Sequence, residues 1–521
     1  MQSLNLDGNQ LRPSELWTVA FRRRPVEFSV TGPAREKIAQ SHNSLMNLLE
    51  AKVPVYGVTT GFGDSGSRAI SFHQSEELQN NLVAYLLCGS GPCLSPEVSR
   101  AILIVRLNSL SRGLSGVSID LIERMQLHLQ NDWLPVIPRE GSLGASGDLI
   151  PLAYLAENIQ GQGRVSCDGR ERLMSEVLTE HNLTPYRLKA KEGLALVNGT
   201  SAMAGQFAVN LNHARFLLEG LCLNSAWLCL ALNGRTEAFE PLVNEQAKRS
   251  PGQSSVAAQV RALLLEENYS AKPLKDIRIE DARTQEWVQD RYSLRCVPQI
   301  AGPVQETLTL LQRWLEEEIN SSSDNPLIGA DSALANGGNF YGGYLSQGMD
   351  YLKISLAHMA DLFDRQIAYV VDEKSNRGLP ANLANWNNLS SEERHLHHGL
   401  KGLHQSASAI TSEILQKAMP GGIFSRSSES HNQDKVSLGM SAAVQCAEML
   451  EPLFTLFTLQ SIILAQALDL RGVKLAGETS RRAYQMIRAA VPFVERDQPL
   501  GERIQTLREA YLRLSRDRGA I

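Results

Sequence analysis

The stretch Gly141-Ser-Leu-Gly-Ala-Ser-Gly-Asp-Leu-Ile-Pro151 crowds three glycines and two serines into a short segment. Asp148 ends this segment, and an apolar run with helical spacing follows from Leu149 to Ile159. Aspartate is a favoured N-cap residue, because its side chain can accept hydrogen bonds from the free N–H groups of a first helical turn. The pattern therefore predicts a tight loop that leads into a capped helix over 149–159.

A second interpretation concerns Ala145, Ser146 and Gly147 within this loop. Because Gly147 has no side chain, its backbone nitrogen can approach the carbonyl carbon of Ala145 closely if the loop is strained. Ring closure between these atoms, with loss of two water molecules, would produce a methylidene-imidazolone electrophile. The residues alone leave the tight turn and the reactive ring both open.

Composition places the chain among ordinary globular enzymes. It has 521 residues, 43% of them apolar, which is enough for a large core and for two or three structural regions. Its 51 basic and 56 acidic residues give a net charge of −5, without a long block of one sign. We therefore expect neither a nucleic-acid partner nor a membrane partner.

Cysteine usage and hydropathy predict a cytoplasmic location. The seven cysteines form no Cys-x-x-Cys pair and have no His-rich neighbourhood at metal-ligand spacing, so we expect reduced thiols and no metal site. The residues that follow Met1 lack the apolar core of a secretory signal, so we expect no such signal. The longest apolar run, Leu453 to Leu470, contains Gln460, Gln466 and Asp469, which favours a buried bundle helix over a membrane span.

Helical periodicity changes along the chain. Short helices over 76–87 and 98–110 follow a glycine loop at 57–63, and a surface hairpin is predicted at 161–170. After residue 199, longer helices are predicted over 205–232, 303–319, 343–371, 395–419 and 436–470. Pro303 suits a first helical position. Helices of this length bury their apolar faces against one another, so the sequence predicts an elongated helix bundle.

Two further strings carry residues suited to chemistry. Tyr56 precedes the glycine loop, and a phenol with an ordinary pKa of about 10 needs nearby positive charge or hydrogen bonds to act as a base. Tyr292-Ser-Leu-Arg295 combines a second phenol with a guanidinium that can bind a carboxylate in bidentate fashion. Taken singly, such residues are more often structural or form surface ion pairs.

Together these strings resemble the aromatic amino acid ammonia-lyase family, which also contains histidine ammonia-lyases and aminomutases. The segment 141–152 is similar to the family's prosthetic-group segment, and the matching motifs run from Tyr56 to Gly439. The resemblance implies a mainly α, histidine/phenylalanine ammonia-lyase-like (fumarase/aspartase-like) fold with a long central helix bundle. It implies an N-terminal catalytic region at 1–204 with the prosthetic-group loop, and a bundle at 205–521 that carries substrate-binding loops.

The resemblance also implies the chemistry of the loop. A methylidene-imidazolone formed from Ala145, Ser146 and Gly147 would take up the amine of an aromatic amino acid, and Tyr56 would remove a β-proton. The chain would need no metal and no nucleotide. Active sites in the family draw on several subunits, so we expect a homotetramer with shared sites.

Other matching positions imply substrate contacts. Arg295 would grip the carboxylate, and Tyr292 would assist at the reacting centre. Asn198, in Leu196-Val-Asn-Gly-Thr-Ser201, resembles an asparagine on a strand that hydrogen-bonds the prosthetic group and the substrate. The remaining family site positions are Gln299, Asn325 and Phe340.

Substrate choice depends on a few positions. Tyr85-Leu86 stands where phenylalanine lyases commonly carry Phe-Leu, tyrosine lyases His-Leu and histidine lyases Ser-His. The Tyr85 hydroxyl could meet a para-hydroxyl group or merely occupy that space. Lys401 and the string Glu429-Ser-His-Asn-Gln433 resemble motifs of phenylalanine lyases. Histidine lyases hold the imidazole with an acidic residue near the position of Gln433, and we expect none at that position here.

The resulting expectation is a bacterial-type phenylalanine ammonia-lyase that releases trans-cinnamate and ammonia. A tyrosine or dual-specificity lyase remains open because of Tyr85. An aromatic 2,3-aminomutase would use the same residues, and Glu429 is the sequence argument against it. A non-catalytic helical scaffold, in which the loop never cyclises, is the alternative from another class.

Overall fold

The computed structural model describes residues 2–21, 26–278, 280, 288–387 and 389–517, most of them in helices. The chain forms two compact units, each built from three stretches of sequence. Unit 1 consists of Met1–Leu211, Leu311–Asp350 and Pro420–Ala447, and unit 2 of Asn212–Leu310, Tyr351–Met419 and Glu448–Ile521. The sequence-based division into a catalytic region at 1–204 and a helix bundle at 205–521 is of another kind, because it cuts the chain once and assigns a function to each part. It stays a prediction.

Unit 1 combines short helices with several small sheets. Its helices are α1 (Pro13–Phe21), α2 (Gly32–Glu50), α3 (Ser75–Leu86), α4 (Pro96–Leu110), α5 (Ile119–Gln130), α6 (Leu149–Ile159), α7 (Met174–Glu180) and α8 (Glu192–Val197). Its strands are β1 (Gln2–Asn5), β2 (Val26–Ser29), β3 (Ser90–Cys93), β4 (Leu134–Pro135), β5 (Pro138–Glu140), β6 (Arg164–Cys167), β7 (Arg170–Leu173), β8 (Leu327–Ile328) and β9 (Leu334–Ala335).

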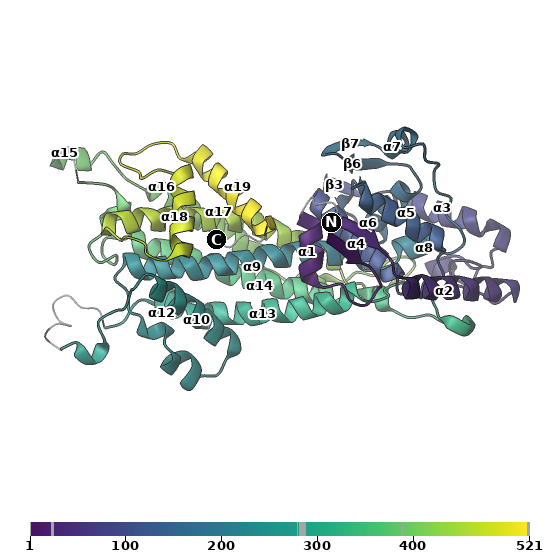
Figure 1. Cartoon of the computed structure of the whole chain (residues 1–521), viewed down its shortest axis with the longest axis horizontal. Coiled ribbons are helices and arrows are strands. Elements are labelled where there is room, and N and C mark those ends of the chain that lie inside the picture. The colour runs from purple at the N-terminus through teal and green to yellow at the C-terminus, as the bar shows by residue number, and fades with distance from the viewer. Residues whose placement is uncertain (1, 22–25, 279, 281–287, 388, 518–521) are drawn as a thin grey trace. The chain divides into compact units, whose positions relative to one another are not determined.

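The sheets are local supports and do not form a common core. Strands β1 and β2 pair in parallel, β3 pairs antiparallel with β5, and β8 with β9. The predicted hairpin is confirmed, since β6 and β7 pair around a turn at Asp168-Gly169, beside α7 in Figure 1. Strand β4 extends this hairpin into a three-stranded sheet.

Helices α3, α6 and α8 pack on one another in unit 1 (Figure 1). The predicted helix at 149–159 coincides with α6, whose apolar residues Leu152, Leu155 and Ile159 are almost completely buried. The loop 141–148 runs between β5 and α6, so its two ends are fixed by a strand pair and by a buried helix. This arrangement holds a short, glycine-rich segment in one conformation.

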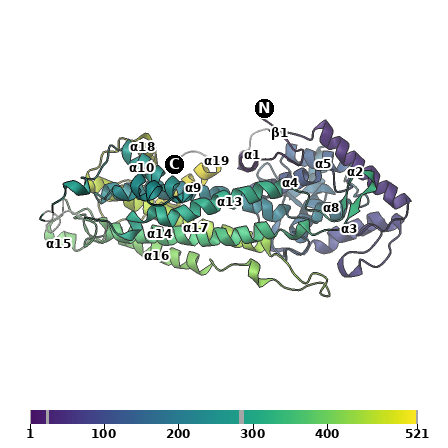
Figure 2. The same ribbon diagram turned by 90° about the horizontal axis from the view of Figure 1, so that it is seen from below.

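Unit 2 is helical in its described residues. It contains α10 (Pro251–Glu266), α12 (Tyr292–Arg295), α15 (Ser391–Arg394), α16 (Lys401–Gln416), α18 (Glu478–Ala490) and α19 (Gly501–Asp517). The rings of Phe216, Phe454, Phe457 and Tyr511 cluster in its core. Helix α16 lies along the second half of α14 in Figure 2, where the Ser408 hydroxyl donates to Asp364 at 2.8 Å.

Four long helices contribute residues to both units: α9 (Ser201–Ala231), α13 (Val297–Ile319), α14 (Gly343–Val371) and α17 (Gly439–Arg471). Helices α9 and α17 are long and apolar enough to cross a membrane, but 89% and 83% of their most apolar windows are buried inside the protein. They are therefore core helices, as predicted for the run Leu453 to Leu470.

Two predicted helix starts were wrong. Helix α16 begins at Lys401, whereas the sequence predicted a helix from residue 395, because turns at 395–396 and 399–400 separate it from the short α15. Helix α13 begins at Val297, so Pro303 lies inside it and not at its first position. The reason is burial: Val297 and Ala301 continue the buried face that Val304 and Leu308 form beyond the proline. The apolar stripe outweighs the one hydrogen bond that a proline removes from a helix.

Candidate active site

The loop at 141–148 is held in a conformation that requires glycine. Gly147 has φ +70°, and a Cβ at this position would overlap the backbone of Gly199. Gly199 N donates to the Ser146 carbonyl at 3.2 Å, and Asp148 N donates to the Gly199 carbonyl at 2.8 Å. The backbone is thus pinned on both sides of Gly147, which fits a loop that presents Ala145, Ser146 and Gly147 in one fixed geometry.

Asp148 anchors this loop in a different way from the one predicted. Its side chain makes no capping hydrogen bond to α6. Instead it is completely buried and accepts hydrogen bonds from Ser142 Oγ at 2.9 Å and from Met203 N, in the first turn of α9, at 2.7 Å. Burial raises the pKa of the Asp148 carboxyl to about 7, and these two hydrogen bonds oppose the rise.

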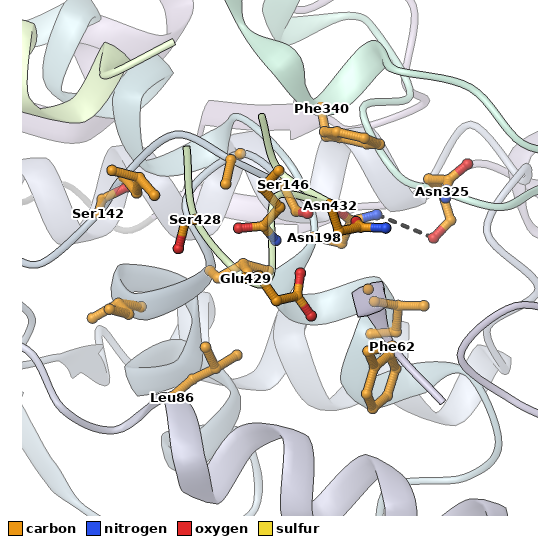
Figure 3. Close-up of a pocket in the computed structure, with 18 of the residues that line it drawn as sticks. Phe62, Leu86, Ser142, Ser146, Asn198, Asn325, Phe340, Ser428, Glu429 and Asn432 are labelled. Atoms are coloured by element: carbon orange, nitrogen blue, oxygen red, sulfur yellow. Dashed lines mark hydrogen bonds between the residues drawn. The ribbon is translucent and has the colours of Figure 1, made fainter. Parts of the chain in front are cut away.

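A cavity of about 660 Å³ opens over this loop, and all of its lining belongs to unit 1. Most of the residues predicted from the sequence line it. They are Tyr56, Tyr85, Leu86, Ala145, Ser146, Gly147, Asn198, Asn325, Phe340, Glu429 and Gln433. Figure 3 shows Ser146, Asn198, Asn432 and Glu429 close together in the middle of the pocket, with Phe340 and Phe62 on opposite sides of this group.

Tyr56 directly precedes the glycine loop, and the backbone of that loop fixes its hydroxyl. Gly63 N donates to the Tyr56 hydroxyl oxygen at 2.6 Å, and the Tyr56 ring meets Phe62 edge-on. Burial raises the pKa of Tyr56, the Gly63 hydrogen bond lowers it, and the negative charge of Glu429 raises it further. A backbone N–H aimed at a phenol oxygen favours the phenolate, which is the form that can accept a proton.

Glu429 reaches the pocket from a tight hairpin. Ser428 and Gln433 form an antiparallel bridge, and Glu429, Ser430 and His431 between them all have positive φ values of 51°, 52° and 66°. Three consecutive residues of this kind are costly for side chains with a Cβ, so the hairpin stores strain at the site. Asp64 N donates to Glu429 Oε1 at 3.2 Å, which connects the hairpin to the loop of Tyr56.

Tyr85 and Leu86 form the end of α3 that faces the pocket. Leu86 is buried, whereas Tyr85 is 60% exposed. Partial desolvation of its hydroxyl, together with the charge of Glu429, raises the pKa of Tyr85 to about 12. The Tyr85 hydroxyl is therefore protonated at neutral pH and can donate as well as accept a hydrogen bond.

The asparagines belong to a polar cluster behind the loop. Asn198 follows α8 directly, so the predicted strand at 196–201 was wrong. An isolated bridge between Gly147 and Gly199 is the strand-like feature that the described residues form here. The prediction failed because the apolar run before Asn198 is so short that its pattern fits a helix as well as a strand. Asn198 Nδ2 donates to the Asn325 carbonyl at 3.1 Å, drawn as a dashed line in Figure 3, and Gly337 N donates to Asn325 Oδ1 at 2.8 Å.

Four predicted residues do not line this pocket. Tyr292, Arg295, Gln299 and Lys401 all belong to unit 2. Tyr292 is 70% exposed, and the Arg295 guanidinium lies 4.6 Å from the centre of its ring. Arg295 Nε and Gln299 Oε1 are buried without a hydrogen-bond partner among the described residues. Of the described lining residues, Lys435 is the only one with a cationic side chain.

The sequence reasoning missed several lining residues. Asp434 directly follows Gln433 and lines the pocket. The expectation concerned the position of Gln433 alone, which carries an amide, and the neighbouring carboxylate was not singled out. The other missed residues lie within about seven positions of a predicted one along the chain and carry no special signal: Phe62, Gly63, Leu82, Gly141, Ser142, Leu143, Leu149, Ile150, Leu194, Asn336, Tyr341, Ser428, Asn432 and Lys435. Within the described residues, no group of three or more His, Cys, Asp or Glu side chains could hold a metal ion.

Known proteins resemble this chain over its full length. Histidine ammonia-lyase of Staphylococcus aureus is 32% identical over 520 residues, which covers 98% of each chain. The structure of tyrosine aminomutase from Streptomyces globisporus matches with a TM-score of 0.92 and 31% identity, over 99% of this chain and 97% of the other. Phenylalanine aminomutase from Pantoea agglomerans matches with a TM-score of 0.92 and 30% identity, over 99% and 100%.

The helical architecture is accordingly the one shared by histidine and phenylalanine ammonia-lyases, as predicted. The sequence pattern described as aromatic amino acid lyase matches residues 11–489, a range that contains the loop, the whole lining of the pocket and the four residues of unit 2. The chain therefore belongs to the aromatic amino acid lyase family and is a carbon–nitrogen lyase.

Proposed function

We propose that this enzyme converts L-phenylalanine to trans-cinnamate and ammonia. The observation that carries the proposal is the composition of the pocket beside Ser146. Leu82, Leu86 and the ring of Tyr85 offer an apolar surface for a phenyl group, and Glu429 lies on the same cavity. An aromatic side chain gains most of its binding free energy from such apolar contact, and the polar groups then fix its orientation.

A methylidene-imidazolone fits the residues at 145–147. The backbone of Gly199 fills the space where a side chain at Gly147 would lie, and Gly199 and Asp148 hold the loop on both sides by hydrogen bonds. When formed, the group supplies an electrophile for the substrate amine. Its formation from Ala145, Ser146 and Gly147 is part of the proposal.

The chain's own residues would then guide the elimination. Tyr56, as phenolate, accepts a β-proton, the C–N bond breaks, and ammonia leaves as the new C=C bond forms. The Gly63 N–H stabilises the phenolate before the transfer. Because a β-proton is very weakly acidic, the base and the substrate must be held in one conformer, and the Asn198 and Phe340 walls of the pocket serve this purpose.

We further propose a homotetramer in which another subunit completes each pocket. The described lining offers only Lys435 as a cation for the substrate carboxylate, while Tyr292, Arg295, Gln299 and Lys401 lie in unit 2. A guanidinium suits bidentate binding of a carboxylate better than an ammonium does. Arg295 of a second subunit would supply it, with Tyr292 beside it.

Histidine is the second candidate substrate. Asp434 lines the pocket next to Gln433, and a carboxylate there could accept a hydrogen bond from an imidazole N–H. The similarity to histidine ammonia-lyase of S. aureus points the same way. Tyrosine stays open because the protonated Tyr85 hydroxyl could bind a para-hydroxyl group, and the similarity to two aminomutases keeps a β-amino acid product open.

One experiment separates these candidates. Purified enzyme is offered phenylalanine, tyrosine and histidine separately, and the products are resolved by chromatography. Cinnamate as the fastest product supports the proposal, and urocanate or coumarate as the fastest product overturns it in favour of histidine or tyrosine. Accumulation of a β-amino acid assigns the chain to the aminomutases.

All seven cysteines are unpaired, which supports the proposed cytoplasmic location.

A further inference from the structure

A fully buried ion pair lies directly behind the pocket. Lys191 Nζ and Asp324 Oδ2 are 2.6 Å apart, and both side chains have no exposed surface. A buried ion pair is weak support for stability, because the desolvation of two charges offsets their attraction. The role of Lys191 and Asp324 is therefore indicated by the other groups that they contact.

The second oxygen of Asp324 holds the pocket asparagine. Asp324 Oδ1 accepts from Asn198 Nδ2 at 3.1 Å and from Asn325 N at 2.7 Å. The same Asn198 Nδ2 also donates to the Asn325 carbonyl at 3.1 Å. Both hydrogens of the Asn198 amide are thus committed to the 324–325 segment, and this fixes which end of the amide is nitrogen and which is oxygen.

The remaining group of this amide has no partner. Asn198 Oδ1 is buried and makes no hydrogen bond to any described residue. A buried carbonyl oxygen without a donor is unfavourable, so it is a ready acceptor for an N–H group that enters the site. The amino group of the substrate is such a donor.

The cations around Asp324 are built in with some strain. Lys191 has φ +73°, a left-handed conformation that is costly for a residue with a Cβ, at the start of α8. Arg106 of α4 is also fully buried, donates to the Ala195 carbonyl of α8, and interacts with Asp324 through its charge. Two basic side chains from separate elements therefore face the one carboxylate of Asp324.

We propose that Lys191 and Asp324 are positioning residues that orient the Asn198 amide so that Oδ1 accepts a hydrogen bond from the substrate's amino group. Asp324 acts through Asn198 and touches no substrate atom, and Lys191 holds Asp324 in place. This inference rests on the proposed function only in so far as the substrate is an α-amino acid.

The test is a double-mutant cycle with Asp324→Asn and Asn198→Ala, measured as kcat/KM for whichever of phenylalanine, tyrosine or histidine the enzyme deaminates. Each single change is expected to lower kcat/KM by about 10- to 100-fold, the scale for loss of one hydrogen bond to a charged group. The kcat/KM of the double variant is expected to lie within about twofold of the value for the poorer single variant, because both changes remove the same interaction.

A binding measurement separates positioning from general damage. In the Ser146→Ala background, calorimetry compares L-phenylalanine with 3-phenylpropanoate, which keeps the ring and carboxylate but lacks the amine. Asp324→Asn is expected to weaken binding of phenylalanine by about tenfold and to leave 3-phenylpropanoate unchanged. If histidine or tyrosine is the substrate, that amino acid and its deamino analogue are used. Asp120→Asn is the matched control, since it removes the partly exposed partner of Lys189 in the same unit.

Folding is checked by thermal melting of each variant. If Asp324→Asn does not fold, the double variant Lys191→Met/Asp324→Asn removes both buried charges together and takes its place. Additive losses in the cycle, or equal losses for the two ligands, would overturn the inference. An enzyme that makes no cinnamate refutes only the choice of phenylalanine, whereas cinnamate formation with an additive cycle refutes only the positioning role.

Discussion

The carboxylate of Glu429 occupies the space beside Gly63, so that a Cβ at Gly63 would overlap both of its oxygens. In the same segment, Asp64 N donates a hydrogen bond to Glu429, and Gly63 N donates one to the Tyr56 hydroxyl. The strained hairpin at 428–433 and the glycine loop of Tyr56 therefore meet at residues 63 and 64. Glu429 sets the electrostatic environment of the proposed base through this contact.

Glu429→Gln should shift the pH profile of the enzyme. The pKa of Tyr56 is raised by burial and by the charge of Glu429, so removal of that charge lowers it. If the Tyr56 phenolate is the base, activity appears as pH rises through its pKa, and the acidic limb of kcat/KM moves to lower pH in the variant. The profile is measured against Glu76→Gln, an exposed change on α3. An unchanged acidic limb would argue against Tyr56 as the titrating group.

Tyr85→Phe tests which aromatic substrate the pocket prefers. The protonated Tyr85 hydroxyl either fills space or binds a para-hydroxyl group. For a phenylalanine lyase, loss of the hydroxyl should change kcat/KM for phenylalanine by less than about threefold, since the ring contact is kept. A selective loss of about tenfold on tyrosine alone would instead assign the hydroxyl to substrate recognition. Parallel assays with both amino acids, against Tyr351→Phe as an exposed control in unit 2, distinguish the two results.

Ser146→Ala should abolish the prosthetic group and leave the fold intact. Ring formation in the proposed form needs the Ser146 hydroxyl to leave as water, and alanine cannot supply it. We expect kcat to fall by at least about a thousandfold, as when a preorganised catalytic group is removed. The near-ultraviolet absorbance of the group should vanish while the circular dichroism spectrum is retained. Ser428→Ala is the control, because it also lines the pocket but lies outside the loop. Full activity of Ser146→Ala would refute the prosthetic-group proposal.

Much of the fold followed from apolar periodicity, and the failures have a common physical cause. Helices α6 and α14 begin and end where the sequence predicted, because Asp148 and the glycines before Gly343 interrupt strong apolar runs. Helix α13 began earlier than predicted because buried Val297 and Ala301 outweighed the signal of Pro303. Local signals fail where tertiary burial competes with them.

The site was predictable as far as it depends on short motifs. Residues 145–147 and Glu429 were recognisable from their strings, and they line one cavity. The acceptor role of Asp148 toward α9 was not predictable, since Met203 lies 55 positions away in the sequence. Asp324, which accepts a hydrogen bond from Asn198 over 126 positions, was not singled out by any motif. Long-range hydrogen bonds of buried polar groups leave no local pattern.

Mixed tetramers test whether sites are shared between subunits. Ser146→Ala and Arg295→Ala should each be inactive alone, since one lacks the electrophile and the other the carboxylate clamp. If Arg295 acts on the pocket of another subunit, coexpression of the two variants creates pockets with Ser146 from one chain and Arg295 from the other. Such mixtures should recover about a tenth or more of the wild-type activity, depending on how the chains assort. Activity no greater than that of either variant alone would place Arg295 in the pocket of its own chain or outside the site.

Asp148 should give the protein a characteristic dependence of stability on pH. The pKa of Asp148 is raised to about 7 in the folded protein, whereas an unfolded aspartate has a pKa of about 3.9. Between these values the folded state holds a proton that the unfolded state has lost, so stability falls as pH rises from about 4 to about 7 and is level above that range. This group contributes a slope of at most about 1.4 kcal/mol per pH unit.

Asp148→Asn should remove that slope. The variant also loses one of the two acceptors used by Ser142 and Met203, which lowers its free energy of unfolding at every pH. The informative quantity is therefore the difference between the two stability curves, measured by urea unfolding in steps from pH 4 to pH 9 at one protein concentration. Ser142→Ala removes a hydrogen bond that lowers the pKa of Asp148, so the falling part of its curve should extend above pH 7. Curves for Asp148→Asn and the wild type that run parallel across this range would mean that the buried carboxyl stays ionised, stabilised by hydrogen bonds such as those from Met203 N and Ser142 Oγ.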